Sequence, residues 1–292
     1  MKKKKTVVIL IIALILILAE KFFGGNASFP EREEGKLYMY AIDVGQADST
    51  LILLPDGENI LIDAGNREDT NLVVEFIKEK GIEKLDYVVA THPHEDHIGG
   101  MPGVIENFEI GTFYMPDSVH TTVYYEDMID ALIKWEVVTE FAEKGVKIKD
   151  GECSIDILSP LPKEYDDFNH VSAVTRITYK DNSFLLMGDA EKINEYDIID
   201  NYGDKIKSDV LKVGHHGSDT SSAYEFLETV DPGLAVISLG KDNDYGHPHK
   251  EVKERLSELK IPYYRTDEVG TVLFISNGKK IEVITEKEVG EE

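Results

Sequence analysis

Between residues 88 and 100 the chain reads Val88-Val89-Ala90-Thr91-His92-Pro93-His94-Glu95-Asp96-His97-Ile98-Gly99-Gly100, a short apolar run followed by three histidines and an aspartate. In an extended segment side chains alternate between faces, so His92 and His94 point the same way and can bind one cation. Asp96 and His97 follow where two glycines let the backbone turn, and they are placed to bind a second cation beside the first. A polar loop that is rich in histidine by chance is the alternative interpretation.

Other ligand-type side chains also follow apolar runs, namely Asp63, Asp189 and the pair His215-His216. Strand ends on a rigid frame bring distant residues to one point, so we predict a single site at one edge of the sheets. Asp189 alone would be a turn residue, but beside the histidine loop it is placed to bridge two cations. The histidine pair by itself fits a metal ligand and a helix cap equally, and the histidine loop favours a ligand.

The composition limits the classes of protein that fit. With 292 residues, of which 42% are hydrophobic, the chain can bury a large core, and we expect one α/β domain. The formal net charge of −25 argues against loose electrostatic capture of a polyanion, so any contact with nucleic acid has to be local. The single cysteine, Cys153, excludes an internal disulfide and a cysteine-based metal site.

The N-terminal segment, residues 1–27, predicts export. A lysine cluster at residues 2–5 precedes an apolar run of 14 residues at 6–19. As a helix this run would be about 21 Å long, short of the roughly 30 Å hydrocarbon core, which favours a signal peptide over a membrane span. An uncleaved signal anchor is the alternative, because the cleavage site is poor and Phe22-Phe23 suits the membrane interface. Both interpretations put the body on the extracellular face, secreted or anchored to the membrane.

Three boundaries follow from charge and periodicity. Residues 28–36 are too charged to pack and are predicted to be a linker, the folded domain spans 37–286, and 287–292 is an acidic tail. Residues 116–145 interrupt the strand pattern and are predicted to be a helical insertion that overhangs the site. Trp135 lies on the apolar face of its helix and is expected to anchor that helix in the core.

Strands and helices alternate along the folded domain. Strands are predicted at 37–44, 49–54, 59–63, 85–90, 113–115, 154–158, 173–179, 183–187, 209–213, 234–239, 263–265 and 271–275. Helices are predicted at 70–80, 102–108, 191–201, 221–229 and 250–260.

Seven motifs carry a family resemblance. They are Asp43-Val44-Gly45-Gln46-Ala47-Asp48-Ser49, Leu61-Ile62-Asp63-Ala64-Gly65, Thr91 to Gly100, Asn169-x-x-Ser172, Leu185 to Asp189, Leu211 to Ser218 and Tyr245-Gly246-His247-Pro248. With them the chain resembles the metallo-β-lactamase-fold hydrolases, and among these the hydrolase domain of the DNA-uptake channel protein ComEC and its stand-alone relatives. The resemblance implies a four-layer αββα sandwich that binds two metal ions at one edge. It does not specify a substrate.

The resemblance also implies roles for individual residues. The implied metal ligands are His92 and His94 for the first ion, Asp96, His97 and His216 for the second ion, and Asp189 as the bridge. The implied catalytic residues are Asp96, Asn169 beside the metal, and His215, which stabilises developing negative charge. His247 and Ser218 are expected to contact the substrate, and Asp63 to orient the histidine loop. Because these ligands include no thiolate, zinc and manganese fit the two divalent sites about equally.

Two positions depart from the family pattern. Many relatives have a third histidine on the first ion where this chain has Asn169-His170, so the first ion is expected to be held more weakly. Relatives often have glycine in place of Ala47, and alanine would be strained there if its φ were positive.

The function implied by the resemblance is metal-dependent hydrolysis, in which water activated by two metal ions attacks phosphorus or a carbonyl carbon. A phosphodiesterase or nuclease of the ComEC-like type is the leading hypothesis, acting on a phosphodiester or another small hydrolysable substrate. Beyond residue 27 the 26 basic and 55 acidic residues give a charge of −29, which disfavours long nucleic acid as the partner. The alternatives are a lactam or ester hydrolase on the same metal site and a non-catalytic metal-binding surface protein.

Overall fold

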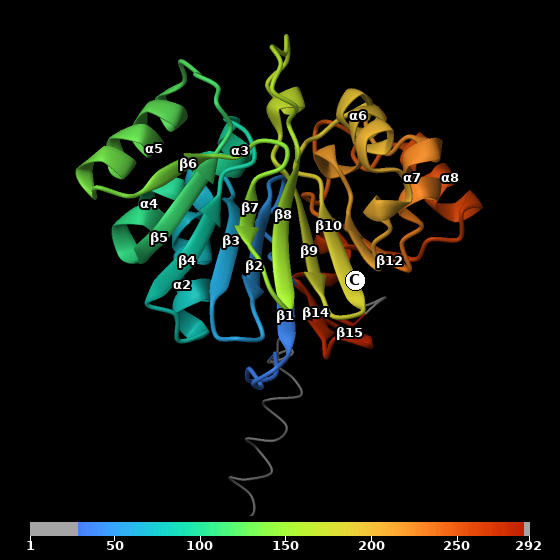
Figure 1. Ribbon diagram of the computed structural model, residues 1–292, viewed down its shortest axis with the longest axis horizontal. Helices are drawn as coiled ribbons and strands as arrows, with labels where there is room; N and C mark the ends of the chain where they lie inside the picture. Colours follow the sequence, from blue (N-terminus) through green and yellow to red (C-terminus); the bar gives the residue numbers. More distant parts are fainter. Residues whose placement is uncertain (1–28, 289–292) are drawn as a thin grey trace, which may run out of the picture.

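The computed structural model describes residues 29–288, so the predicted leader and most of the acidic tail lie outside the described residues. Within that range, two β-sheets face each other between two layers of helices (Figure 1). The strands of the first sheet are β1 (Leu37–Ala41), β2 (Ser49–Leu53), β3 (Asn59–Ala64), β4 (Lys84–Val89), β5 (Glu109–Met115), β6 (Thr139–Phe141), β14 (Val272–Ser276) and β15 (Ile281–Thr285). Their order is β15-β14-β1-β2-β3-β4-β5-β6.

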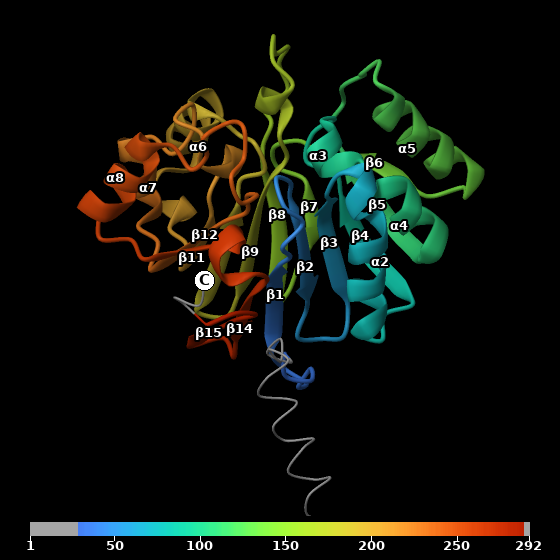
Figure 2. The same ribbon diagram turned by 180° about the vertical axis from the view of Figure 1, so that it is seen from behind.

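The second sheet has the order β13-β12-β11-β10-β9-β8-β7. Its strands are β7 (Lys147–Lys149), β8 (Cys153–Ser159), β9 (Val174–Tyr179), β10 (Asn182–Leu186), β11 (Val210–Lys212), β12 (Leu234–Ile237) and β13 (Tyr263–Arg265). The helices over the first sheet are α2 (Thr70–Glu79), α4 (Met101–Asn107) and α5 (Val123–Lys134), and those over the second sheet are α6 (Lys192–Tyr202), α7 (Tyr224–Val230) and α8 (Lys250–Glu258). Figure 2 shows these two helical layers from behind.

The side chains of β1 show why the layers form. All five are buried, and alternate residues face opposite sides of the sheet. Tyr38 and Tyr40 pack with the helices that cover the first sheet, whereas Met39 packs into the core between the two sheets. A third cluster joins the second sheet to its own helices. Burial on both faces requires near-continuous apolar strands, and it produces the predicted helix-sheet-sheet-helix order.

Parallel pairing brings several strand ends to one edge. Strands β3, β4 and β5 are mutually parallel, and so are β10, β11, β12 and β13. Asp63 lies at the end of β3, and the loops that leave β4, β10 and β11 carry the histidine loop, Asp189 and the histidine pair. The predicted elements agree with the observed ones to within about four residues at each end, while β6, β7 and β15 were not predicted.

The start of the described chain is packed onto the domain, contrary to the expectation of an unpacked linker. The Phe29 ring lies 5.5 Å from the Tyr40 ring, and the Lys80 ammonium lies 5.4 Å from the Phe29 ring. Arg32 donates hydrogen bonds to the carbonyl oxygens of Leu54 and Gly57 in the turn between β2 and β3. The Phe29 ring and the Arg32 guanidinium therefore hold this segment against the domain, although its charge predicted that it would not pack. Across residues 29–288, every helix is too short or too polar to cross a bilayer.

The insertion at 116–145 contains helix α5 and the edge strand β6. Thr122 caps the helix by accepting a hydrogen bond from the Tyr125 amide, and Met128 and Leu132 are buried against the first sheet's helical layer. Trp135 is 51% exposed at the end of the helix, so the prediction that it anchors the helix in the core is wrong. The apolar face ends one turn earlier than the sequence pattern indicated, because the helix stops at Lys134.

Glu195 on α6 gives a prediction about stability. It is buried, its carboxylate accepts hydrogen bonds from the amides of Ser222 and Ala223, and burial raises its pKa to about 8. The folded state therefore binds a proton that the unfolded chain releases near pH 4.5, so this group's contribution to the free energy of unfolding falls as pH rises from about 4.5 through about 8. The loss is at most about 5 kcal/mol.

We expect Glu195→Gln to flatten the decline in stability between pH 5 and pH 9. Urea unfolding at several pH values measures this, with the exposed Glu228→Gln on α7 as the matched control. A Glu195→Gln curve parallel to the wild-type curve would contradict the prediction.

Candidate metal centre

The histidine loop ends at a glycine, Gly100, whose surroundings leave no room for a side chain. Strand β4 delivers His92, the helical turn α3 (Glu95–Ile98) begins after His94, and Gly100 packs against β3. A Cβ atom on Gly100 would lie 2.2 Å from the carbonyl oxygen of Ala64, so a larger residue would push the loop away from the sheet. The loop therefore holds its side chains at the edge where the parallel strands end.

His92, His94 and Asp189 form the first ligand group. The His92 Nε2 atom lies 3.0 Å from the His94 Nδ1 atom and 3.8 Å from an Asp189 carboxylate oxygen. His92 and Asp189 are buried, and one ligand atom from each of the three residues lies within 4.8 Å of the others. This spacing suits three ligands around one cation.

Asp96, His97, Asp189 and His216 form the second ligand group, again with one atom of each within 4.8 Å of the others. The His97 Nε2 atom lies 3.2 Å from the Asp189 Oδ1 atom, and the His216 Nε2 atom lies 3.2 Å from Asp96 and 3.6 Å from Asp189. Asp189 belongs to both groups. The structure thus brings together all six residues predicted to be metal ligands.

The donor atoms fit a divalent cation. The His97 Nε2 and Asp189 Oδ1 atoms are buried and make no hydrogen bond, although they face each other. Buried polar atoms without a partner are costly, and a cation between them would satisfy both. Imidazole nitrogens and carboxylate oxygens are ligands of Zn²⁺ and Mn²⁺. The structure therefore supports a candidate site for two divalent ions and leaves their identity open.

The charges around the second ligand group also favour a cation. Burial lowers the pKa of His216, but the carboxylates of Asp189 and Asp48 raise it more, to about 9. Burial likewise lowers the pKa of His97, and Asp189 and Asp63 raise it well above its usual value. Without a metal, protons supply the positive charge that these carboxylates attract.

Asp63 holds the histidine loop from behind. Its carboxylate accepts hydrogen bonds from the Thr91 amide at 2.8 Å and the Thr91 hydroxyl at 2.7 Å, and it lies 2.7 Å from the His97 Nδ1 atom. These contacts leave the His97 Nε2 atom free to face Asp189. Asp63 has a φ of 59°, a strained value for an aspartate, which the three contacts stabilise. This is the geometry expected of a residue that orients the loop.

His215 and Glu191 form a pair beside the centre. The His215 Nε2 atom lies 3.7 Å from Asp189, and its Nδ1 atom lies 3.1 Å from both the Glu191 carboxylate and the Thr220 hydroxyl. The hydrogen bond with His215 lowers the pKa of Glu191 to about 2. The sequence analysis missed Glu191, which follows Asp189 by two residues in the turn after β10.

The two residues that replace the family's third histidine lie on the Glu191 side of the centre. Asn169 is buried, with its amide nitrogen 3.5 Å from Glu191 and its Oδ1 atom without a partner. The His170 Nε2 atom lies 3.0 Å from the other Glu191 oxygen, and His170 belongs to neither ligand group. Asn169 therefore lies near His215 through Glu191, and the first ligand group contains two histidines.

The two predicted substrate-side residues differ in their surroundings. The His247 ring lies 5.7 Å from the His215 ring and 6.3 Å from the His216 ring, with its Nδ1 atom buried and without a partner. Ser218 is buried, and its hydroxyl lies 2.9 Å from that of Thr220, which links it to His215. In the same region, Gly45 has a positive φ of 68° and Ala47 does not, so the alanine is not strained.

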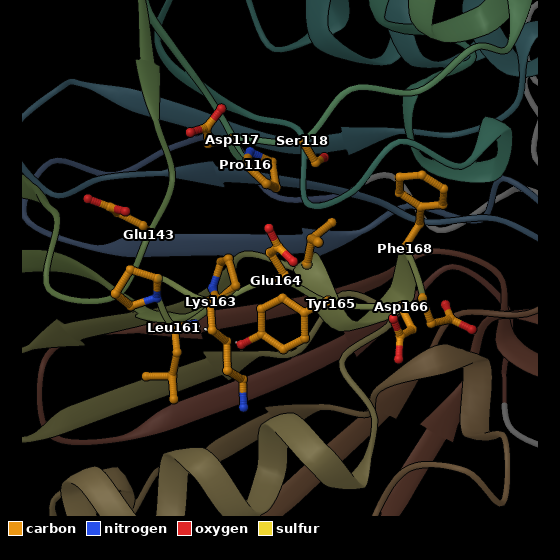
Figure 3. A pocket seen from close by; sticks show the side chains of 14 residues that line it. Pro116, Asp117, Ser118, Glu143, Leu161, Lys163, Glu164, Tyr165, Asp166 and Phe168 are labelled. Carbon is orange, nitrogen blue, oxygen red and sulfur yellow. Dashed lines mark hydrogen bonds between the residues drawn. The ribbon is translucent and has the colours of Figure 1, made fainter.

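A cavity of about 630 Å³ lies between the insertion and the loop before Asn169 (Figure 3). Its lining includes five carboxylates, from Asp117, Glu143, Glu164, Asp166 and Asp167. Its one basic side chain, Lys163, pairs with Asp197 at 2.6 Å. Phe168 also lines the cavity, and its ring lies 6.4 Å from the His94 ring, so the cavity adjoins the first ligand group.

The fold and the candidate site define a class of protein. The model of the metallo-beta-lactamase superfamily matches residues 42–241, and the chain belongs to this superfamily, whose members are generally metal-dependent hydrolases. The solved structure of the metallo-beta-lactamase fold protein YhfI from Bacillus subtilis has the same fold. It aligns with a TM-score of 0.54 at 14% identity, over 82% of this chain and 99% of that one.

Within the superfamily, the chain is similar to competence proteins. It is 32% identical over 258 residues to ComE operon protein 3 from Bacillus subtilis, and 30% identical over 238 residues to Competence protein ComA from Neisseria gonorrhoeae. The alignments cover 82% and 80% of this chain, but the chain spans only about a third of the length of those proteins, 33% and 31%. The ComEC-like resemblance found in the sequence is confirmed.

Proposed function

We propose that this chain is a metal-dependent phosphodiesterase that acts on small phosphodiesters. The observation that carries the proposal is the sharing of Asp189 by two ligand groups, with His215 beside them. Sites for two adjacent ions suit in-line displacement at phosphorus, because both the attacking and the leaving oxygen need a positive partner. When bound, two divalent ions would also lower the pKa of a water ligand to about 7.

The ligands proposed for the ions follow the two groups. His92, His94 and Asp189 would hold the first ion, and Asp96, His97, Asp189 and His216 the second. His94 is only half-buried and the Asp96 side chain is 30% exposed, so both groups are open to solvent on one side. An open side leaves room for water and substrate, which favours a catalytic site over a structural one.

We assign His215 a proton-donating role. Glu191 and Thr220 hold its Nδ1 side, so the Nε2 atom faces the centre. The paired imidazolium can donate the Nε2 proton to the leaving oxygen of a phosphodiester and stabilise the negative charge on the phosphoryl group. A positive side chain here matches an anionic phosphodiester better than it matches a neutral lactam carbonyl.

The acidic cavity limits the size and charge of the substrate. Its five carboxylates would repel the successive phosphates of a long nucleic acid that crossed it, and its lysine is already paired. A short phosphodiester, or a single head group, presents one phosphate to the centre and avoids this repulsion. We therefore propose small phosphodiesters, with long DNA as a poor substrate.

Metal dependence and a substrate panel test this function. We expect the purified protein to hydrolyse bis-p-nitrophenyl phosphate, to lose this activity in chelator and to regain it with Zn²⁺ or Mn²⁺. The monoester p-nitrophenyl phosphate, a chromogenic lactam and linear DNA should be turned over at least about tenfold more slowly, a gap of about 1.4 kcal/mol in activation free energy. Turnover of the lactam without turnover of the diester would refute the proposal.

The location of the protein is a separate proposal, based on the basic and apolar residues at 2–19. We propose that the body lies on the extracellular face. In Figure 1 the blue start of the described chain lies below the sheets, whereas α3, which carries Asp96 and His97, lies at their upper end. A chain tethered at its N-terminus would thus present the centre away from the bilayer.

A further inference from the structure

A buried ion pair lies behind the second ligand group and joins the two halves of the chain. Lys212 is on β11 and Asp48 is in the loop before β2, and their side chains are 3% and 2% exposed. Taking two charges out of water is expensive, and a pair of apolar side chains would often serve the fold as well. In residues 29–288, every other ion pair that a lysine or arginine forms with a carboxylate has at least one side chain that is 14% or more exposed. The pair of Lys212 and Asp48 is therefore the most buried of these ion pairs.

Asp48 faces the rear nitrogens of two histidines. Its Oδ1 atom lies 3.7 Å from the His216 Nδ1 atom, and its Oδ2 atom lies 3.9 Å from the His97 Nδ1 atom. These are the ring nitrogens on the far side from Asp189. Each also has a closer partner, the carbonyl oxygen of Ser238 at 2.9 Å for His216 and Asp63 at 2.7 Å for His97.

The backbone of Asp48 is tied to the same group. Its amide donates to the carbonyl oxygen of Asp96 at 3.0 Å, and its own carbonyl accepts from the Gly65 amide at 2.8 Å. On the other side, the Lys212 ammonium lies 3.5 Å from the carbonyl oxygen of Val213, directly before the loop that carries His216. The ion pair therefore joins the segment that carries Asp96 and His97 in the first half to the segment that carries His216 in the second.

We propose that Asp48 is a positioning residue for the second ligand group, and that Lys212 stabilises the fold by neutralising this buried carboxylate. Asp48 favours the orientation of the His97 and His216 rings that a cation needs. Asp48 is in contact distance of neither histidine of the first ligand group, so the effect is specific to one ion. The inference rests on the proposed function only in taking the second ligand group as a cation site.

Variants that remove the charge of Asp48, of Lys212 or of both distinguish a residue that orients metal ligands from one that only stabilises the fold. Asp48→Asn removes the carboxylate and leaves the Lys212 ammonium unpaired behind two histidines, so we expect the affinity of the second ion to fall about 10- to 100-fold, as for other residues that support metal ligands. Lys212→Met leaves the carboxylate, so the second ion should still bind, while the unpaired buried charge destabilises the metal-free protein. The double variant should regain stability without regaining the affinity for the second ion.

The measurements are metal content after dialysis, titration with Co²⁺ followed by visible absorption, and thermal unfolding with and without metal. Lys149→Met is the matched control, because Lys149 on β7 is also a largely buried lysine. Its ammonium lies 2.7 Å from the Asp56 carboxylate. It should retain both ions. A purely structural pair would make Asp48→Asn and Lys212→Met lose stability and metal together, which would overturn the inference, as would a wild-type affinity for both ions in Asp48→Asn.

The experiment distinguishes this inference from the proposed function, because cobalt binding needs no substrate. The wild type could bind two ions, lose the second selectively in Asp48→Asn, and still not hydrolyse the diester. This result would reject the proposed function and support the positioning role. Diester hydrolysis together with unchanged ion binding in Asp48→Asn would reject the positioning role alone.

Discussion

Replacing Asp189 by alanine is expected to remove both metal ions and to reduce hydrolysis to the level of chelator-treated enzyme. Asp189 lies 3.2 Å from His97, 3.6 Å from His216 and 3.8 Å from His92, and it is the one residue shared by the two ligand groups. Without it, the first ligand group has no carboxylate and the second keeps only that of Asp96. Since the ions are assigned several kcal/mol of transition-state stabilisation, the rate should fall on the order of a thousandfold or more.

Metal analysis and diester turnover measure this effect together. Asp189→Asn keeps the shape of the side chain and removes its charge, so it should behave like the alanine variant while circular dichroism shows an intact fold. Asp200→Ala, an exposed aspartate on α6, is the matched control and should retain both ions and full activity. If Asp189→Ala hydrolyses the diester as fast as wild type, the assignment of the bridge is wrong.

Replacing His215 by alanine is expected to lower kcat by about 10²- to 10⁴-fold while both ions stay bound. The loss should depend on the leaving group. It should be small for p-nitrophenolate, which needs no proton, and large for an alkoxide leaving group such as that of a dinucleoside monophosphate. Glu191→Gln should show the same dependence with a smaller loss, because Glu191 acts by holding the His215 ring.

His170→Ala is the matched control for this pair, since His170 contacts the other oxygen of Glu191 and belongs to neither ligand group. It should change kcat by less than about tenfold, which corresponds to less than 1.4 kcal/mol. An equal loss for both leaving groups in His215→Ala would assign His215 to charge stabilisation alone.

The sequence was sufficient for the mixed α/β fold class and for naming six candidate ligands that the structure brings together. Continuous apolar runs such as Leu37–Ala41, and turns at glycine, locate strands through local backbone preferences. The histidine loop and Asp189 could be named because ligand chemistry depends on residue type and on short spacing at a strand end. Trp135 was predicted to lie in the core, but it is exposed because the helix ends at Lys134. The spacing of apolar residues does not indicate where a helix ends.

The supporting residues could not be read from the chain. Glu191 looks like an ordinary surface carboxylate in sequence, and Asp48 and Lys212 stand in motifs of the family resemblance without a role being implied for either. Their contacts with His215, His216 and one another cross between the halves of the domain. A contact between residues so far apart depends on how two sheets pack, and no local pattern encodes that packing.

The amino-acid sequence by itself indicated the strands, the helices and the histidine loop, because these follow from periodicity, residue chemistry and spacing over a few positions. The αββα class and the six candidate ligands were implied by the family resemblance that its motifs carry. Only the tertiary structure decided that the His215 ring is held by Glu191, and that Asp48 lies behind the His216 ring. Both histidines follow the same strand, and the difference between them comes from what packs against each ring: Ser238 and Asp48 behind one, Glu191 and Thr220 behind the other.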